Sequence, residues 1–278
     1  MIDVLLLDHL LKGLLSNIQL VFVGDHNQLP SVGAGQILKD MIESDQLPVV
    51  HLEELYRQDE HSYISTLAGL IKKGEVDQSL FEKYSDFTFL RCTSNSIRLN
   101  LKDLCMTLKQ KGYDERRVQI MAPMYRGENG IDLLNQDLQE VFNPPDQEKE
   151  ELKYGDVIFR EQDKILQLVN MPEENVFNGD IGMIERIVPA SRSKSHKNEI
   201  YINYDGTVVK YLPKDFIKIK HGFVITIHKS QGSEFECVIM PISRSYYPML
   251  YRKLIYTGVT RAKKKLILLP YSNSKKKT

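Results

Sequence analysis

The sequence predicts an α/β fold interrupted by a smaller all-β unit. Apolar, β-branched runs alternate with helical patterns before residue 151 and again after residue 221. Between these parts, short strand patterns follow one another with only turns separating them. The length of 278 residues is enough for about two domains. We therefore expect a layered α/β architecture that carries an inserted β-barrel.

The first part of the chain alternates helices with strands. Apolar residues at helical spacing predict the helices, and Gly74 and Gly112 end two of them. The expected helices cover residues 1–15, 36–44, 62–73 and 96–111, and the expected strands cover residues 17–23, 48–55 and 87–90.

A second α/β unit is expected from residue 115. An acidic linker up to residue 151 interrupts it, and the pattern resumes after residue 221. Its expected strands cover residues 118–122, 223–227, 237–240 and 266–269, and its expected helices cover residues 131–142 and 249–256.

The interruption over residues 152–220 predicts a small antiparallel barrel. Turn residues such as Asn178–Gly179 and Asp205–Gly206 separate its strands. The expected strands cover residues 157–159, 165–168, 182–188, 199–204 and 208–212.

The composition excludes several classes of protein. No segment approaches the roughly 20 apolar residues of a membrane span. Charged residues interrupt the N-terminal apolar run, so it does not resemble a signal peptide, and we expect a cytoplasmic protein without a membrane partner. The three cysteines lack metal-ligand spacing and no HExxH motif occurs, so no metal site is proposed within the chain. A net charge of +0 argues against a simple basic DNA-coating protein, although a local groove is compatible with it.

Polar side chains gather directly after the apolar run that begins at Phe223. The stretch 223–236 reads FVITIHKSQGSEFE, which places a histidine, a lysine and a glutamine off the end of a predicted strand. Strand ends in α/β folds present such side chains to ligands. For this stretch alone, a solvated turn between a strand and a helix is an equally good interpretation.

Three further stretches resolve that ambiguity. Residues 20–30 read LVFVGDHNQLP, residues 56–58 read YRQ, and residues 256–263 read YTGVTRAK. Together with TIHKSQGSEFE, in this order, they resemble motifs III, IV, V and VI of the superfamily 1 helicases, most closely of the RecD-like branch. The resemblance spans residues 20–263 and depends on the combination, because each stretch alone is a weak match.

The resemblance implies a fold and a division of the chain. Such motors have two RecA-like lobes with ATP in the cleft between them. The resemblance assigns residues 1–114 to the C-terminal remnant of the first lobe, residues 115–151 and 221–278 to the second RecA-like lobe, and residues 152–220 to an inserted SH3-like barrel.

The sequence lacks the phosphate-cradling GxxxxGK[ST] loop and the family's acidic Mg²⁺-binding pair. We therefore expect a fragment that begins downstream of both, that needs an N-terminal lobe as its partner, and that is inactive as an ATPase by itself. Because the remnant of the first lobe has lost sheet neighbours, apolar surface near residues 20–23 should be exposed and prone to association.

The resemblance also implies catalytic residues. Arg261 matches the arginine finger, whose planar, always-charged fork suits the phosphate oxygens. Arg57 is the second such arginine, and Gln28 would sense the γ-phosphate or the attacking water. The competing interpretation is a surface salt bridge for either arginine, and for Gln28 a loop amide that caps the following helix.

Three residues of motif V are expected at the nucleotide. By resemblance, Glu234 accepts from the ATP ribose, Gly232 lets the backbone pass close to the nucleotide, and Gln231 lies towards the phosphates. ATP and Mg²⁺ are the implied cofactors, with most Mg²⁺ ligands outside this chain.

Four residues are candidates for DNA contact. Thr226 and His228 match residues that hold the DNA backbone, which fixes register without reading sequence. Tyr125 and Arg126 offer an aromatic ring and a guanidinium for stacking and phosphate contact. For His228 a structural role is a stronger alternative than that of a general base, because no nucleophile partner is evident, and for Tyr125 packing between lobe and barrel is equally open. Phe177 in the segment NVFNG is either a core residue or faces DNA.

The function implied is that of an ATP-dependent DNA helicase, moving 5′→3′ along single-stranded DNA and acting at duplex junctions. An alternative is a non-catalytic DNA- or partner-binding module, since the phosphate loop is absent. A third reading places the motor in a nuclease complex or a conjugative relaxase, because both use RecD-like motors.

Overall fold

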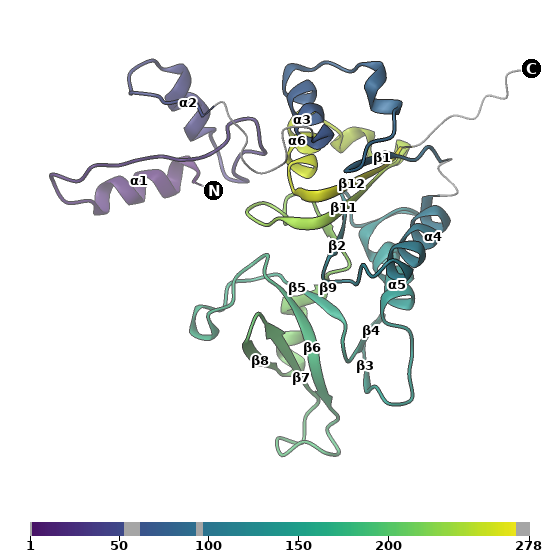
Figure 1. Cartoon of the computed structure of the whole chain (residues 1–278). Helices are drawn as coiled ribbons and strands as arrows, with labels where there is room; N and C mark the ends of the chain where they lie inside the picture. The colour runs from purple at the N-terminus through teal and green to yellow at the C-terminus, as the bar shows by residue number, and fades with distance from the viewer. Residues whose placement is uncertain (1, 53–61, 93–96, 271–278) are drawn as a thin grey trace, which may run out of the picture.

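A parallel five-stranded sheet lies at the centre of the molecule (Figure 1). The computed structural model describes residues 2–52, 62–92 and 97–270. The sheet order is β1 (Phe87–Phe89), β12 (Ala262–Pro270), β11 (Phe235–Ile242), β2 (Val118–Ala122) and β10 (Val224–Thr226). All neighbouring pairs are parallel. Most residues of these strands are apolar and buried because both faces of the sheet are covered.

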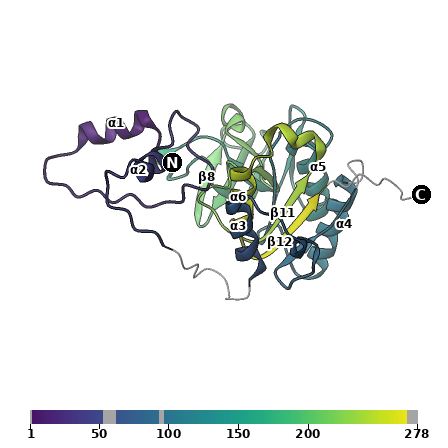
Figure 2. The ribbon, with the colours of Figure 1, turned by 90° about the horizontal axis from the view of Figure 1, so that it is seen from above.

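Helices cover both faces of this sheet, as Figure 2 shows. The helices α4 (Ile97–Gln110) and α5 (Ile131–Phe142) cover one face, and α3 (Tyr63–Lys73) and α6 (Arg252–Val259) cover the other. Neighbouring residues of β2 illustrate the alternation, because Ile120 packs in the cluster under α4 and α5 whereas Met121 packs in the cluster under α3 and α6. The α/β fold class predicted from the sequence is confirmed.

Three elements that precede residue 115 pack on this sheet or pair with it. The strand β1 pairs with β12, α3 packs in the same cluster as α6, and α4 packs beside α5. Residues 63–92 and 97–110, which lie before the expected boundary at residue 114, therefore supply elements that pack on this sheet. Buried side chains on all three elements hold them to the central sheet.

The inserted unit is antiparallel, as its turn pattern predicts. A hairpin of β3 (Glu151–Tyr154) and β4 (Val157–Arg160) stands beside a five-stranded sheet. That sheet has the order β8 (Thr207–Tyr211), β7 (Glu199–Tyr204), β6 (Ile181–Val188), β5 (Lys164–Gln167) and β9 (Ile219–His221). Alternate apolar residues of these strands form one separate core.

A buried polar network joins this barrel to α5. The carboxylate of Asp163 accepts from the amides of Gln139 (2.7 Å) and Asn143 (2.8 Å), and the ring of His221 lies 3.1 Å from it. The ammonium of Lys164 donates to the carbonyls of Glu115 (2.7 Å) and Val118 (3.0 Å) at the start of β2. The barrel is thus fixed to the sheet unit through satisfied buried polar groups.

The N-terminal segment, residues 2–52, lies beside the sheet unit (Figure 1). It contains α1 (Val4–Gly13) and α2 (Ile37–Glu43), which confirm two of the expected helices, and neither helix buries a residue. Leu29 is the one buried residue among these described positions.

Two predicted strands in this segment are wrong as far as the structure describes them. Residues 17–23 and 48–52 form no strand, and residues 53–55 lie outside the described part. Val21 is 76% exposed and Val23 is 88% exposed. An isolated strand has no ladder to complete its backbone hydrogen bonds, so β-propensity alone does not form one. The expected exposure of apolar surface near residues 20–23 is therefore observed.

Candidate nucleotide and DNA site

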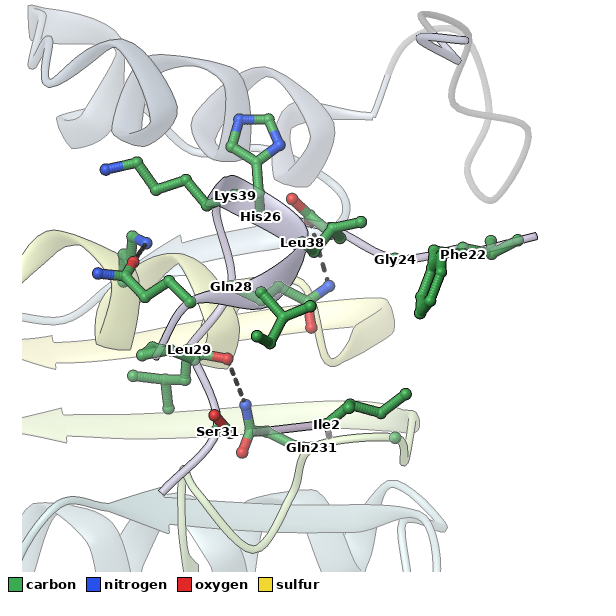
Figure 3. Close-up of a pocket in the computed structure, with 17 residues that line it drawn as sticks. Ile2, Phe22, Gly24, His26, Gln28, Leu29, Ser31, Leu38, Lys39 and Gln231 are labelled. Carbon is green, nitrogen blue, oxygen red and sulfur yellow. Dashed lines mark hydrogen bonds between the residues drawn. The ribbon is translucent and has the colours of Figure 1, made fainter. Parts of the chain in front are cut away.

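A pocket of about 410 Å³ lies between the GDHNQLP loop (residues 24–30) and the turn that follows β10 (Figure 3). Gln28 lines it from the loop, and Gln231 and Gly232 line it from the turn. Lys39 and Lys253 add positive charge, while Phe22 and Leu38 add apolar walls. The structure thus brings Gln28 together with Gln231 and Gly232, which follow it about 200 residues later in the chain.

The GDHNQLP loop is held against the turn and against α6 by side-chain hydrogen bonds. The amide of Gln231 donates to the carbonyl oxygen of Leu29 (3.0 Å), as Figure 3 shows, and the backbone amide of Leu29 donates to the hydroxyl of Thr257 (2.8 Å). The hydroxyl of Tyr256 donates to the carboxylate of Asp25 (2.8 Å). These contacts connect the stretches resembling motifs III, V and VI.

Tyr256, Thr257 and Asp25 had been assigned no role from the sequence. They stand inside the quoted motifs, but their partners lie more than 200 residues away, so sequence reading alone could not pair them. Burial, together with the negative charge of Asp25, raises the pKa of Tyr256 well above its usual value. The phenol therefore stays a donor to Asp25.

Gln28 does not cap the following helix. Its side-chain amide donates to the carboxylate of Asp25 (3.3 Å), and its backbone amide donates to the carbonyl of Asp25 (3.2 Å). The N-cap of α2 is Gln36. Gln28 is therefore positioned by the loop itself, at the pocket wall.

The turn after β10 is tightly closed. The carbonyl of Thr226 accepts from the amides of Lys229 (3.0 Å) and Ser230 (3.2 Å), and its hydroxyl also accepts from Lys229 (3.1 Å). Gly232 has a φ of +84° and no atom within 4 Å of an added Cβ, so it is open towards the pocket. A side chain there would be strained by the backbone conformation rather than by crowding.

Arg261 is buried, and its described hydrogen bonds go to neighbouring backbone and hydroxyl groups. The residue is only 4% exposed. Its guanidinium donates to the carbonyls of Thr257 (3.1 Å) and Ser233 (3.1 Å) and to the hydroxyl of Thr260 (3.2 Å). Glu234 pairs with Lys263 at 3.0 Å. Neither Arg261 nor Glu234 lines the pocket, although Arg261 binds the loop directly beyond Gly232. Arg57 lies outside the described residues.

Of the four DNA candidates, the side chains of Tyr125 and Thr226 interact with each other. Burial raises the pKa of Tyr125, and this interaction lowers it by a smaller amount. The ammonium of Lys220 lies 4.8 Å from the ring centre of Tyr125. His228 is half-buried, and burial lowers its pKa. Arg126 is exposed.

The described residues contain neither a candidate metal site nor a helix that could span a membrane. Among residues 2–52, 62–92 and 97–270, no group of three or more His, Cys, Asp or Glu side chains is arranged to hold a metal ion. No helix within that part of the chain is long and apolar enough to cross a membrane.

Family models match three successive parts of the chain. A model described as an AAA domain matches residues 1–95, the ATP-dependent RecD-like DNA helicase SH3 domain matches residues 134–204, and the UvrD-like helicase C-terminal domain matches residues 221–269. The second match covers most of the inserted barrel, and the third covers the segment that carries the turn after β10 and α6.

Curated relatives agree with these models. The ATP-dependent RecD2 DNA helicase of Deinococcus radiodurans is 29% identical over 88% of this chain and 32% of its own length. The RecBCD enzyme subunit RecD of Buchnera aphidicola is 26% identical over 99% of this chain and 52% of its own length. A solved Pif1 helicase from Bacteroides, in complex with ADP-AlF3 and ssDNA, is 16% identical with a TM-score of 0.44 over 88% of this chain and 60% of that chain.

The chain therefore spans between about a third and a half of the length of these two curated relatives. The order of the family models follows the order of the motifs, and the barrel lies where the RecD-like model matches. The chain is therefore similar, through these successive matches, to the RecD-like superfamily 1 DNA helicases.

Proposed function

We propose that this chain is part of a motor that couples ATP hydrolysis to movement on single-stranded DNA and to unwinding at duplex junctions. The observation that carries the proposal is the contact between the GDHNQLP loop and α6, made by Leu29 with Thr257 and by Asp25 with Tyr256. A motor must transmit the state of its nucleotide between lobes, and these hydrogen bonds join the first-lobe segment to the second.

The pocket chemistry suits a nucleotide. Its volume of about 410 Å³ lies in the range of small-molecule sites. Lys39 and Lys253 offer charge for phosphates, Gln28 and Gln231 offer amide donors, and Gly232 leaves space for close approach. The Mg²⁺ that accompanies ATP would neutralise phosphate charge, with most of its ligands supplied from outside this chain.

The arginine-finger role of Arg261 is retained in this proposal. The guanidinium lies against the carbonyl of Ser233, just after the pocket residue Gly232, and a modest reorientation on lobe closure would direct it to the γ-phosphate. Glu234 would accept from the ribose after exchange of its partner Lys263. Arg57 remains the second proposed arginine.

The test uses a protein in which this chain is joined to a first lobe that supplies GxxxxGK[ST]. Arg261→Ala should lower DNA-stimulated ATP turnover by about 10³-fold, with a much smaller effect on KM, because a finger acts on the transition state. Arg244→Ala, at an exposed position, is the matched control and should retain turnover. Thermal unfolding of both variants separates lost catalysis from lost folding. Unchanged turnover in Arg261→Ala would contradict the finger role.

A second candidate function is a non-catalytic DNA- or partner-binding module. The observation that favours it is the absence of GxxxxGK[ST] from the 278 residues. It predicts salt-dependent binding of single-stranded DNA by the chain itself. It also predicts that the protein gains no ATPase activity when the first lobe is supplied.

A further inference from the structure

The loop between β5 and β6, here called the barrel loop (residues 168–180), is held in a defined conformation. The backbone amide of Asn178 donates to the side chain of Asn170 (2.9 Å), that of Gly179 donates to the carbonyl of Gln167 (3.0 Å), and that of Phe177 donates to the carboxylate of Asp180 (2.7 Å). Figure 1 shows it leaving the barrel beside β5, on the side where α1 and α2 lie. Its tip is thus preorganised before any ligand binds.

This loop contacts the turn that follows β10. The ammonium of Lys229 donates to the side-chain oxygen of Asn178. Gly179 passes so close that an added Cβ would lie 3.6 Å from the carbonyl of Lys229, and its φ is +105°. The amide of Lys229 in turn bonds Thr226, which meets Tyr125. The barrel loop is therefore joined by direct contacts to the predicted DNA-contact residues.

Phe177 occupies the tip of the barrel loop without serving the barrel core. It is 44% exposed, whereas its neighbour Val176 is fully buried in that core. The loop conformation is fixed by backbone hydrogen bonds and by Asn170 and Asp180, so the phenyl ring is not needed to hold it. A large aromatic ring kept exposed on a rigid loop beside a lysine is suited to an aromatic ligand with phosphate groups.

We propose that Phe177 stacks on a base of single-stranded DNA and that the Asn178–Lys229 contact holds this platform in line with the turn after β10. The inference deepens the proposed function and rests on it, because both require the strand to cross Tyr125 and Thr226. Stacking tolerates every base, which suits a protein that moves along DNA without reading its sequence. Asn178 is a positioning residue, since it acts through Lys229 and the loop.

The chain offers a direct optical test because it contains no tryptophan. Phe177→Trp places the sole tryptophan of the variant at the proposed platform, where it can be excited selectively over the tyrosines, and titration with an oligothymidine should quench its emission saturably. The control is Phe81→Trp, at a phenylalanine that is 54% exposed and packs on Phe89 of β1, at the opposite sheet edge from β10. Its emission should not change with the same oligonucleotide.

Affinity completes the test. With a labelled oligothymidine and the whole chain, Phe177→Ala should weaken binding by about 5- to 150-fold, the range that corresponds to losing one stacked base. Phe177→Trp should bind as tightly as the unaltered chain, because tryptophan can also stack on a base. If Phe177 served only to hold the loop, the larger tryptophan would not be expected to replace it. Asn178→Ala should weaken binding less and reduce the quenching in the Phe177→Trp background. Circular dichroism checks that each variant folds.

The outcomes separate this inference from the function on which it rests. If the unaltered chain binds the oligonucleotide but Phe177→Ala binds equally well and Phe177→Trp is not quenched, the stacking proposal is overturned and the motor proposal stands. In that case the exposed ring would be assigned to a protein partner. If the unaltered chain does not bind single-stranded DNA, the stacking proposal is overturned, whereas the motor proposal is decided separately by the ATPase measurement on the protein that carries the first lobe.

Discussion

Arg261 illustrates what a single residue does in this fold. Its donors reach the carbonyl of Thr257, at the end of α6, and the carbonyl of Ser233, in the loop before β11. A buried guanidinium requires such acceptors because an unpaired buried charge is costly. The same contacts that satisfy the charge also hold the end of α6 beside the pocket turn.

Tyr256 gives a prediction at the same scale. Tyr256→Phe removes the hydroxyl that donates to Asp25 (2.8 Å) while keeping the ring. Because this is a partly buried hydrogen bond to a charged group, the variant should lose roughly 1–3 kcal/mol of the free energy of unfolding. Chemical denaturation with urea measures it.

The matched control is Tyr251→Phe, one turn earlier and more exposed. It should unfold as the unaltered chain does. Equal stability of the two variants would show that the Tyr256–Asp25 contact contributes nothing to holding the GDHNQLP loop.

Elements in this chain form where they find partners. The helices α3 and α4 and the strand β1 were all expected from their patterns, and each packs on or pairs with the central sheet. The apolar run over residues 17–23 has no neighbouring strand among the described residues, so it forms no strand and most of its side chains are exposed. Helix α1 forms because its hydrogen bonds are internal, and its N-cap Asp3 accepts from Leu6.

The exposed face of α1 leads to a second prediction. Leu5 is 65% exposed and Leu15, just beyond the helix, is 80% exposed. We expect the chain by itself to associate as its concentration rises, because exposed apolar patches favour contact. Replacing both residues with lysine should reduce this association, which sedimentation velocity measures.

Leu99→Lys is the control for this experiment, since Leu99 is 66% exposed on α4, far from α1 in Figure 1. It should leave association unchanged. A chain that remains monomeric at every concentration would count against the exposed N-terminal segment as an interaction surface.

At the scale of the whole molecule, the barrel and the sheet unit are joined by buried polar groups rather than by a flexible linker. Asp163 binds α5 through Gln139, and Lys164 binds the start of β2 through two carbonyls. This arrangement predicts that the barrel moves with the second lobe as one body. The platform at Phe177 would then keep its place relative to the turn after β10.

Lys164 makes this junction sensitive to pH. Burial lowers the pKa of its ammonium group to about 7. Between about pH 7 and the ordinary lysine value of about 10.4, the unfolded chain binds a proton that the folded chain lacks. The contribution of Lys164 to stability therefore increases as pH rises through this window and is lost as pH falls towards 7.

Lys164→Met should remove this dependence. Between about pH 7.5 and 9.5, the free energy of unfolding of the unaltered chain should rise more steeply than that of the variant, by at most about 1.4 kcal/mol per pH unit. Urea denaturation across this range measures the slopes, and Lys214→Met, at an exposed position, should keep the original slope. Parallel slopes for Lys164→Met and the unaltered chain would contradict the prediction.

Sequence patterns determined much of this protein. The run over residues 118–122 became β2 with the expected bounds, the turn residues at Asp205–Gly206 separate β7 from β8, and the order of the motifs predicted the resemblance to RecD-like helicases that the family models match. These features are local, because propensity, periodicity and turn chemistry act between near neighbours in the chain.

Only the tertiary structure decided which motif residues meet. It placed Gln28, Gln231 and Gly232 at one pocket, buried Arg261 against backbone carbonyls, and paired Tyr256 with Asp25. It also showed that residues 17–23 lack the strand that their composition favours. The physical reason is the same in each case: hydrogen bonds and burial depend on partners that are distant along the chain, and only folding brings those partners together.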